Sequence, residues 1–530
     1  MKVTHIPFQK TGFFSKTMSD YLEQNEVLQS FYSNFSNLEG FKKQLEEKSA
    51  SFKVASRTIL VDALKKQYKG VELSEETQHH IDLLQLENTF TITTGHQLNL
   101  FTGPLYFLYK IISVINLCED LTAKFPKHHF VPIYWMATED HDFDEINYFN
   151  FREAKVQWNR NDGGAVGQFS TDGLQAVYEE FSKQLGTTKN AAYLKKLFSD
   201  GYLNHDNLAV ATRYIANELF STYGLVIIDG DDIALKKEFA PFVKDELLNQ
   251  TSFKAVSKTI VTLEKNYPIQ VNPRETNLFY LGENLRERII KEENTYKVNN
   301  TDITFSSEEI LKELNAHPER FSPNVIMRPL YQEVVLPNLC YIGGGGELAY
   351  WLELKNYFTS TQTPFPILLL RNSVQIISKK QQGKLDNLKI STEELFLKQN
   401  DLLALKVIEN ADVSFGFAEQ KAQLEEHFNR LKAIAKKTDP SFVGAVNAQE
   451  KKQLNGLDNL EKRLLRAEKR KHKDLVERIV ALQDQLLPNQ SLEERQRNFS
   501  EFYLEYGDGF IDALKNALKP LQLEFTILEL

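Results

Sequence analysis

The stretch FTITTGHQLNLFTGPLYFLYKIISVINL, residues 90–117, decides the fold class of this chain. Residues 90–93 are a short β-favouring run that meets a glycine turn at Thr94 and Gly95. Residues 104–117 are apolar nearly all round, which suits a buried helix, and Pro104 is compatible with the first turn of that helix. The stretch therefore predicts a strand, a turn and a buried helix in succession.

Four further apolar runs follow the same plan. Residues 130–137, 225–228, 339–342 and 365–370 each end in a polar or glycine-rich turn, and helical patterns lie between them. Short apolar strands that alternate with helices are typical of a parallel sheet. The predicted fold class is therefore α/β with a parallel-sheet core. Because ligands of such sheets bind at the carboxyl ends of the strands, we expect the turns to converge on one mouth.

Composition narrows the classes of protein. The chain has 530 residues, 42% of them apolar, and a formal net charge of −9. Disorder as the main state is excluded, and we expect no nucleic-acid partner. The two cysteines, Cys118 and Cys340, suit small core residues better than a disulfide scaffold, a zinc cluster or a nucleophile. Without a signal peptide or a membrane-spanning run, the chain is expected to be soluble and cytoplasmic, with no membrane partner.

The chain changes character after about residue 378. Leucine-like residues recur at intervals of three and four in residues 417–437 and 449–487, which predicts two coiled-coil helices. Asp439, Pro440 and Gly444 suggest a reversal between them, so we expect an antiparallel helical arm. Residues 151–201 show little strand signal, and residues 251–321 are similarly irregular, with short amphipathic stretches and turn signals. The predicted stretches are 1–150, the first half of the core; 151–220, an inserted connecting segment; 221–377, the second half with a further insertion near 251–321; 378–490, the arm; and 491–530, a C-terminal segment.

Three constellations carry candidate chemistry. In the first, Gly95 and His96 stand between the strand and the helix. Backbone N–H groups at a helix N-terminus attract anions, and His96 could donate to a phosphate or transfer a proton. Alternatively, Gly95 and Gly103 only shape turns and His96 is structural. Neither a Walker A motif nor GxGxxG is present.

The second constellation is the acidic segment 139–145, directly after a predicted strand. It contains Glu139, Asp140, His141 and Asp142. Crowded ionisable groups are costly unless they meet solvent, a cation or a ligand amine. A divalent-metal site, an ammonium site with one carboxylate as base, and an exposed acidic loop all remain open.

The third constellation is MRPLYQEVVLPNLCYIGGGGELAYWLELK, residues 327–355. Four successive glycines are costly in chain entropy, so they favour a close backbone approach to a ligand over a plain structural loop. Arg328 could hold a carboxylate or phosphate as a bidentate pair. Arg371 and Asn372, at the end of the next strand, are expected to contribute polar groups.

These residues carry a family resemblance. The stretches 94–110, 132–147, 327–355 and 368–374 resemble the BshC family of bacillithiol biosynthesis. The stretches 6–22 and 491–507 resemble it too, so the likeness covers nearly the whole chain. It implies a Rossmann-like core similar to class I aminoacyl-tRNA synthetases and nucleotidylyltransferases, with connecting insertions and a coiled-coil arm for homodimerisation.

The implied reaction joins the carboxyl group of L-cysteine to the amine of glucosaminyl-malate. Such an amide needs an activated carboxyl group, so the resemblance implies ATP or another nucleotide, with Mg²⁺ if so, and no tightly bound metal. The full HIGH tetrad and the KMSKS loop of the synthetases are missing. The alternatives are a nucleotidyltransferase, a metal-assisted phosphohydrolase, or a non-catalytic nucleotide-binding assembly protein.

The candidate site residues fall into two groups. The predicted catalytic residues are His96, Asp140, His141 and Asp142. The predicted substrate- or nucleotide-binding residues are Gly95, Gln97, Asn99, Thr102, Gly103, Glu139, Asn147, Arg328, Glu333, Gly343, Gly344, Gly345, Gly346, Glu347, Tyr350, Arg371 and Asn372.

Overall fold

The computed structural model describes residues 1–152, 154–160, 163–412 and 416–530. The chain divides into two compact units. The first unit comprises Met1–Gln9, Phe13–Gln375 and Glu493–Leu528; the second comprises Lys10–Gly12, Ile376–Leu492 and Glu529–Leu530. Most of the C-terminal segment therefore folds with the first unit.

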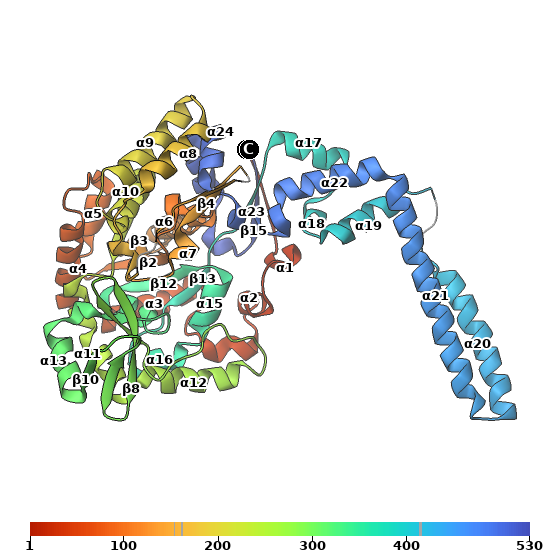
Figure 1. The fold of residues 1–530 in the computed structure, drawn as a ribbon, viewed down its shortest axis with the longest axis horizontal. Coiled ribbons are helices and arrows are strands. Elements are labelled where there is room, and N and C mark those ends of the chain that lie inside the picture. Colours follow the sequence, from red (N-terminus) through yellow and green to blue (C-terminus); the bar gives the residue numbers. More distant parts are fainter. Residues whose placement is uncertain (153, 161–162, 413–415) are drawn as a thin grey trace. The chain divides into compact units, whose positions relative to one another are not determined.

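A parallel sheet lies in the middle of the first unit (Figure 1). In the described part of the chain its spatial order is β13-β12-β2-β3-β6, and every pairing is parallel. The strands are β2 (Thr89–His96), β3 (His129–Met136), β6 (Val226–Asp229), β12 (Asn338–Gly343) and β13 (Ile367–Leu370). The predicted α/β fold with a parallel sheet is confirmed. Because β2 is central and the chain continues to both of its sides, the strand order reverses there, which is where such sheets bind ligands.

The first strand and helix are longer than their apolar runs predict. Gly95 and His96 pair with Trp135 and Met136 of β3, so His96 ends the strand instead of lying in the turn. The helix that follows, α6 (Tyr106–Lys124), extends beyond residue 117. Sheet pairing and packing prolong both elements past the point where local propensity ends.

Helices surround the sheet of the first unit (Figure 1). The apolar core joins Phe41 and Leu45 of α3 and Val114 and Leu117 of α6 to the strands. The helices of this unit are α2 (Lys16–Leu22), α3 (Leu38–Ser51), α4 (Val54–Gln67), α5 (Glu75–Leu83), α6, α7 (Phe143–Ile146), α8 (Leu174–Leu185), α9 (Lys189–Leu203), α10 (Leu208–Phe220), α11 (Ile233–Asn249), α12 (Thr251–Leu263), α13 (Ser307–Ala316), α14 (Arg328–Val335), α15 (Gly345–Leu352), α16 (Lys355–Ser360), α23 (Glu493–Gln496), α24 (Phe499–Tyr506) and α25 (Gly509–Ala517).

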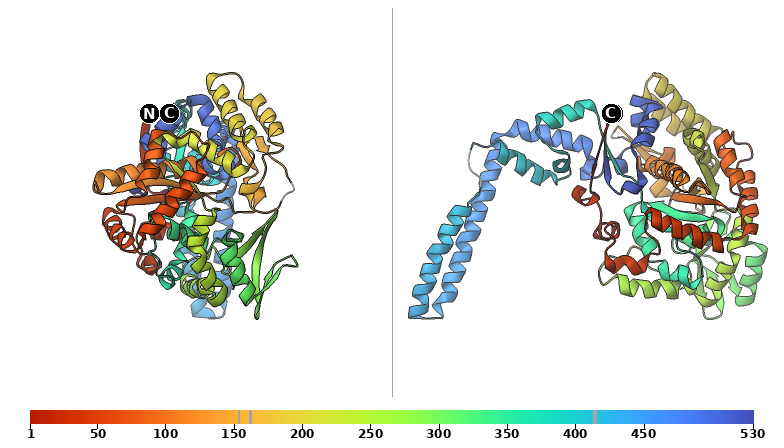
Figure 2. Two further views of the ribbon diagram at one scale, coloured as in Figure 1. Left: turned by 90° about the vertical axis from the view of Figure 1, so that its left-hand side faces the viewer. Right: turned by 180° about the vertical axis from the view of Figure 1, so that it is seen from behind.

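The insertions contain strands that the sequence analysis missed. After the short hairpin β4 (Tyr148–Phe151) and β5 (Ala154–Gln157), the second insertion forms an antiparallel sheet, visible as a separate green layer in Figure 2. Its order is β10-β9-β8-β7-β11, and the strands are β7 (Leu278–Gly282), β8 (Leu285–Glu292), β9 (Thr295–Val298), β10 (Thr304–Ser306) and β11 (Phe321–Pro323). The expectation of an irregular segment there was wrong. In β8, LRERIIKE, most side chains are charged and only Ile289 is buried, so no apolar run marks the strand.

The second unit carries the predicted helical arm. Helices α20 (Ala418–Thr438) and α21 (Phe442–Lys471) lie side by side as an antiparallel hairpin (Figure 1). The reversal is at Asp439 and Pro440, but Gly444 lies inside α21, so its assignment to the turn was wrong. The other helices of this unit are α17 (Lys379–Asn387), α18 (Thr392–Leu395), α19 (Gln399–Glu409) and α22 (Lys473–Leu486). Among the described helices, none has the length and apolarity needed to cross a membrane.

Candidate active site

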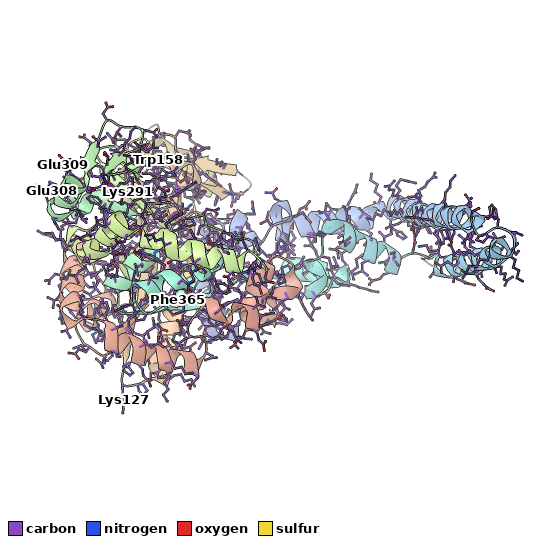
Figure 3. All side chains as sticks on the ribbon, turned by 90° about the horizontal axis from the view of Figure 1, so that it is seen from below. Lys127, Trp158, Lys291, Glu308, Glu309 and Phe365 are labelled. Atoms are coloured by element: carbon purple, nitrogen blue, oxygen red, sulfur yellow. The ribbon has the colours of Figure 1, made fainter. Side chains whose placement is uncertain are left out.

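The turns at the carboxyl ends of β2, β3 and β12 open into one cavity of about 610 Å³. Predicted residues from all three constellations line it, so His96, Asp140 and Glu347 share one cleft. The predicted residues that line this cavity are Gly95, His96, Gln97, Glu139, Asp140, His141, Asp142, Arg328, Glu347 and Tyr350. Lys127, by contrast, precedes β3 at the opposite edge of the sheet, where its side chain projects from the surface (Figure 3).

A buried ion pair joins the first constellation to the third. Lys110 of α6 places Nζ 2.6 Å from Oε1 of Glu347 and donates to the carbonyl oxygen of Gly95 at 2.8 Å. Glu347 also accepts from the hydroxyl of Tyr341 at 2.9 Å and from the backbone N–H of Gly344. Burial lowers the pKa of Lys110. Glu347 is half-buried, which would raise its pKa, but Lys110 together with the hydrogen bonds from Tyr341 and Gly344 outweighs that effect and holds the pKa of Glu347 below the ordinary value. The pair is therefore ionic, and it fixes the glycine turn relative to β2.

Arg328 enters the same cavity from α14. Its guanidinium donates to Gln332 Oε1 at 3.1 Å and lies 3.4 Å from the Tyr350 hydroxyl. Gln332 in turn donates to Glu333, which is fully buried and ion-paired with Lys48 at 3.1 Å. Glu333 therefore lies behind the cavity wall, where it orients Arg328 through Gln332. The contacts with Gln332 and Tyr350 do not use all five N–H donors of the guanidinium, so Arg328 can also donate to an anionic ligand.

Asp140 and Glu139 are neighbours with opposite pKa shifts. Burial of Asp140 favours the neutral acid, but hydrogen bonds from His141 and from Gln97, the latter 2.9 Å long, outweigh it and lower its pKa. Burial raises the pKa of Glu139, although Lys236 of α11 lies 2.6 Å from its Oε1. Adjacent carboxyl groups whose pKa values are shifted in opposite directions can take different roles: Asp140 can act as a permanent anion, and Glu139 can act as a proton acceptor.

The inserted sheet supplies the outer wall of the cavity. Arg286 of β8 stacks on Phe279 of β7, with 4.0 Å between guanidinium carbon and ring centroid. Its Nη1 lies 2.6 Å from Nδ1 of His141. Because a guanidinium N–H can only donate, Nδ1 of His141 is the acceptor in this contact. Arg274 and Arg288 of the same insertion also line the cavity, which therefore faces the acidic segment with a cluster of cations.

His96 is buried at the base of the cavity, with 7% of its surface exposed. Its ring packs against Tyr106 and Phe107 at centroid distances of 5.6 and 5.0 Å. Burial, reinforced by the charges of Lys110 and Arg371, places the pKa of His96 well below its ordinary value. His96 is therefore neutral at pH 7 and can interact with a ligand through hydrogen bonding but not through charge.

The glycine turn also borders a second cavity of about 160 Å³. The predicted residues that line it are Gly344, Gly345, Gly346 and Arg371. Asn99 and Thr102 border a small void behind His96. The other predicted residues lie outside the three described cavities: Gly103 accepts from Asn498, Asn147 accepts from Trp158, Glu333 is ion-paired with Lys48, Gly343 ends β12, and Asn372 bonds Ser113.

The sequence analysis missed several residues of the main cavity. Lys110 had a readable signal, because a lone lysine in an otherwise apolar helix must find a buried partner or reach solvent. The arginines Arg274, Arg286 and Arg288, and Lys236, which pairs with the cavity residue Glu139, had no such signal, because their own segments give no hint of which surface they face. Among the described residues, no three histidine, cysteine, aspartate or glutamate side chains are grouped as a metal site requires.

A parallel α/β sheet with a charged cavity at its switch point defines a protein of the Rossmann-like class. Residues 1–372 match the family description "Bacillithiol biosynthesis BshC, N-terminal Rossmann-like domain", and residues 374–530 match its "C-terminal coiled-coil domain". The chain belongs to the BshC family of bacillithiol biosynthesis.

Related proteins align with this chain along nearly its whole length. A protein from Flavobacterium psychrophilum is 58% identical over 525 residues, and one from Flavobacterium johnsoniae is 56% identical over 523 residues; each alignment covers 99% of both chains. Both are provisionally named cysteine ligase BshC. A solved arginyl-tRNA synthetase from Plasmodium falciparum aligns with 12% identity and covers 82% of this chain and 76% of its own, but its TM-score of 0.22 supports no argument about the fold.

Proposed function

We propose that this enzyme joins the carboxyl group of L-cysteine to the amine of glucosaminyl-malate, after a nucleotide has activated the carboxyl group. The observation that carries the proposal is that the main cavity has negatively charged side chains on one wall and positively charged side chains on another. Carboxylates on Glu139, Asp140 and Asp142 face a cluster of arginines. A substrate that bears both an amine and a dicarboxylate matches such a cavity.

The protonation state of each residue in the main cavity indicates its role in the reaction. Asp140, whose pKa is lowered, would bind the ammonium form of the amine, and Glu139, whose pKa is raised, would accept its proton before attack. The arginines of the insertion would hold the malate carboxylates as bidentate pairs. Neutral His96 would donate or accept one hydrogen bond at the reacting carboxyl group.

A nucleotide would be bound near the glycine turn and Arg328. The donor set fits such a group, because Arg328 keeps free N–H groups and Lys110 holds the turn in place. The nucleotide would supply the leaving group that a free carboxylate lacks. Mg²⁺ would accompany the phosphates as part of the co-substrate.

The reaction is tested by incubating the purified enzyme with cysteine, glucosaminyl-malate and ATP. Product mass and the released nucleotide are followed together. Product with AMP supports adenylation of cysteine, whereas product with ADP supports an acyl phosphate. If folded protein forms no amide with any nucleotide triphosphate, the proposal is wrong.

We further propose that the arm forms a homodimer and that the enzyme acts in the cytoplasm. Large apolar side chains remain exposed along the arm: Leu431 is 37%, Ile434 59% and Leu460 52% exposed. Side chains of this kind on a coiled coil are usually covered by another helix. The two buried free cysteines are compatible with a reducing compartment.

A further inference from the structure

The second cavity lies on the far side of the glycine turn from the main cavity. Helix α15 separates the two, because Glu347 and Tyr350 face the main cavity while Gly346 and Ala349 face the second. A cavity of about 10–15 Å³ accommodates one water molecule. At about 160 Å³ the second cavity therefore has room for a small polyatomic ligand.

A buried guanidinium with an unused donor lines this cavity. Arg371 is 3% exposed, and its Nη atoms bond Glu494 at 2.7 Å and Ser373 at 3.0 Å. Its Nε has no hydrogen-bond partner among the described residues. A Cβ placed on Gly344 would lie 3.9 Å from that atom, so Nε lies beside the glycine turn. A buried N–H of this kind costs free energy until an acceptor binds it.

Two further positive features converge on the same space. The cavity contains the N-terminus of α15, where the backbone N–H groups of Gly345 and Gly346 have no partner within the helix. Arg495 lines the cavity from α23, and its side chain is exposed to solvent. The nearby carboxylates are each neutralised, since Glu494 pairs with Arg371 and Glu347 pairs with Lys110. The cavity therefore has a net positive charge.

We propose that the second cavity is an oxyanion site that takes a phosphate group through Arg371 Nε, Arg495 and the N-terminal turn of α15. A helix N-terminus beside guanidinium groups matches phosphate in both charge and geometry. The glycines let the anion approach the backbone closely, because they carry no side chains of their own. This inference goes beyond the proposed ligation and does not depend on it.

The site is tested by titrating the full-length protein with inorganic phosphate, using calorimetry and ³¹P NMR line broadening. Arg495→Gln should weaken phosphate binding about tenfold, as expected for the loss of one charged contact. Lys127→Gln is the matched control, because it removes one positive charge from the opposite edge of the sheet (Figure 3). Comparing AMP with inorganic phosphate, with adenosine as the phosphate-free control, distinguishes the source: tighter binding of AMP than of phosphate indicates a nucleotide-borne group, and equal affinity indicates free phosphate.

A second pair of variants tests the role of the backbone. Gly346→Ala adds a methyl group that meets no atom within 4 Å, so the fold tolerates it while the methyl group obstructs the N-terminal turn. Gly509→Ala, in the first turn of α25, also meets nothing within 4 Å and is the control. We expect Gly346→Ala to weaken phosphate binding severalfold with an unchanged melting temperature. The proposal is overturned if the wild-type protein binds no phosphate at about 10 mM, if neither Arg495→Gln nor Gly346→Ala weakens binding, or if only Arg288→Gln in the main cavity does.

Discussion

Replacing Lys110 by methionine isolates the most deeply buried charge of the main cavity. The variant keeps the length and the apolar stem of the side chain but leaves Glu347 without its cation, which lies 2.6 Å away in the wild type. Removing one partner of a buried ion pair costs about 3–5 kcal/mol. Because Glu347 keeps hydrogen bonds from Tyr341 and Gly344 and its side chain is 29% exposed, we expect the lower end, about 3 kcal/mol.

The loss should depend on pH in a definite direction. In the wild type the pKa of Glu347 lies below its ordinary value, so the pair stabilises the fold above the unfolded pKa and is lost as pH falls through the folded pKa. In Lys110→Met the burial of the Glu347 carboxyl is no longer offset by the cation; it outweighs the hydrogen bonds from Tyr341 and Gly344 and raises the pKa of Glu347. The folded variant then binds a proton that the unfolded chain does not, and its stability falls as pH rises. The stability difference from wild type should therefore be larger at pH 8 than at pH 5.

Urea denaturation at the two pH values measures this difference. The double variant Lys110→Met/Glu347→Gln should recover much of the loss, because it leaves no uncompensated charge. Lys312→Met is the control: it breaks an exposed pair with Glu308, a side chain on the surface of α13 (Figure 3), and should leave the urea midpoint unchanged. A single variant as stable as wild type at pH 8, or a double variant no better than the single, would refute the reasoning.

Three further predictions concern the site and the arm. The pKa of His96 is depressed in the folded protein, so below pH about 6.5 the unfolded chain binds a proton at this histidine that the folded protein does not, and the wild type loses stability. His96→Gln should remove about 1.4 kcal/mol of that loss per pH unit. Identical pH profiles of the two proteins in urea denaturation would contradict this prediction. Arg286→Gln should raise the KM for the amine substrate about tenfold at unchanged melting temperature, and an unaltered KM would exclude its contact with substrate. Glu at both Leu460 and Leu464 should yield monomers in sedimentation analysis, whereas an unchanged dimer mass would mean that the arm packs only within one chain.

The sequence predicted the elements that carry strong local signals. The strand, glycine turn and apolar helix of residues 90–117 were recognisable because a buried strand and a buried helix are both continuously apolar. The two arm helices were recognisable by their spacing. The antiparallel strands β7–β11 were not, because β8 alternates charged residues with few apolar ones and its stability comes from cross-strand partners.

The candidate site divides in the same way. The acidic segment and the glycine turn were identified because unusual local composition needs a reason, and the structure places both in one cavity. The counter-charges were not identified. Lys110, Lys236 and Arg286 acquire their roles from side chains far away in the sequence, such as Glu347 and His141.

By itself, the sequence determined where strands and helices form and which turns hold functional groups. It did so because backbone propensity, apolar periodicity and glycine content are local properties. Only the tertiary structure decided which charges meet, which histidine is buried and neutral, and which turns share a cavity. Electrostatic energies depend on distance and burial, and those quantities exist only once segments hundreds of residues apart have packed together.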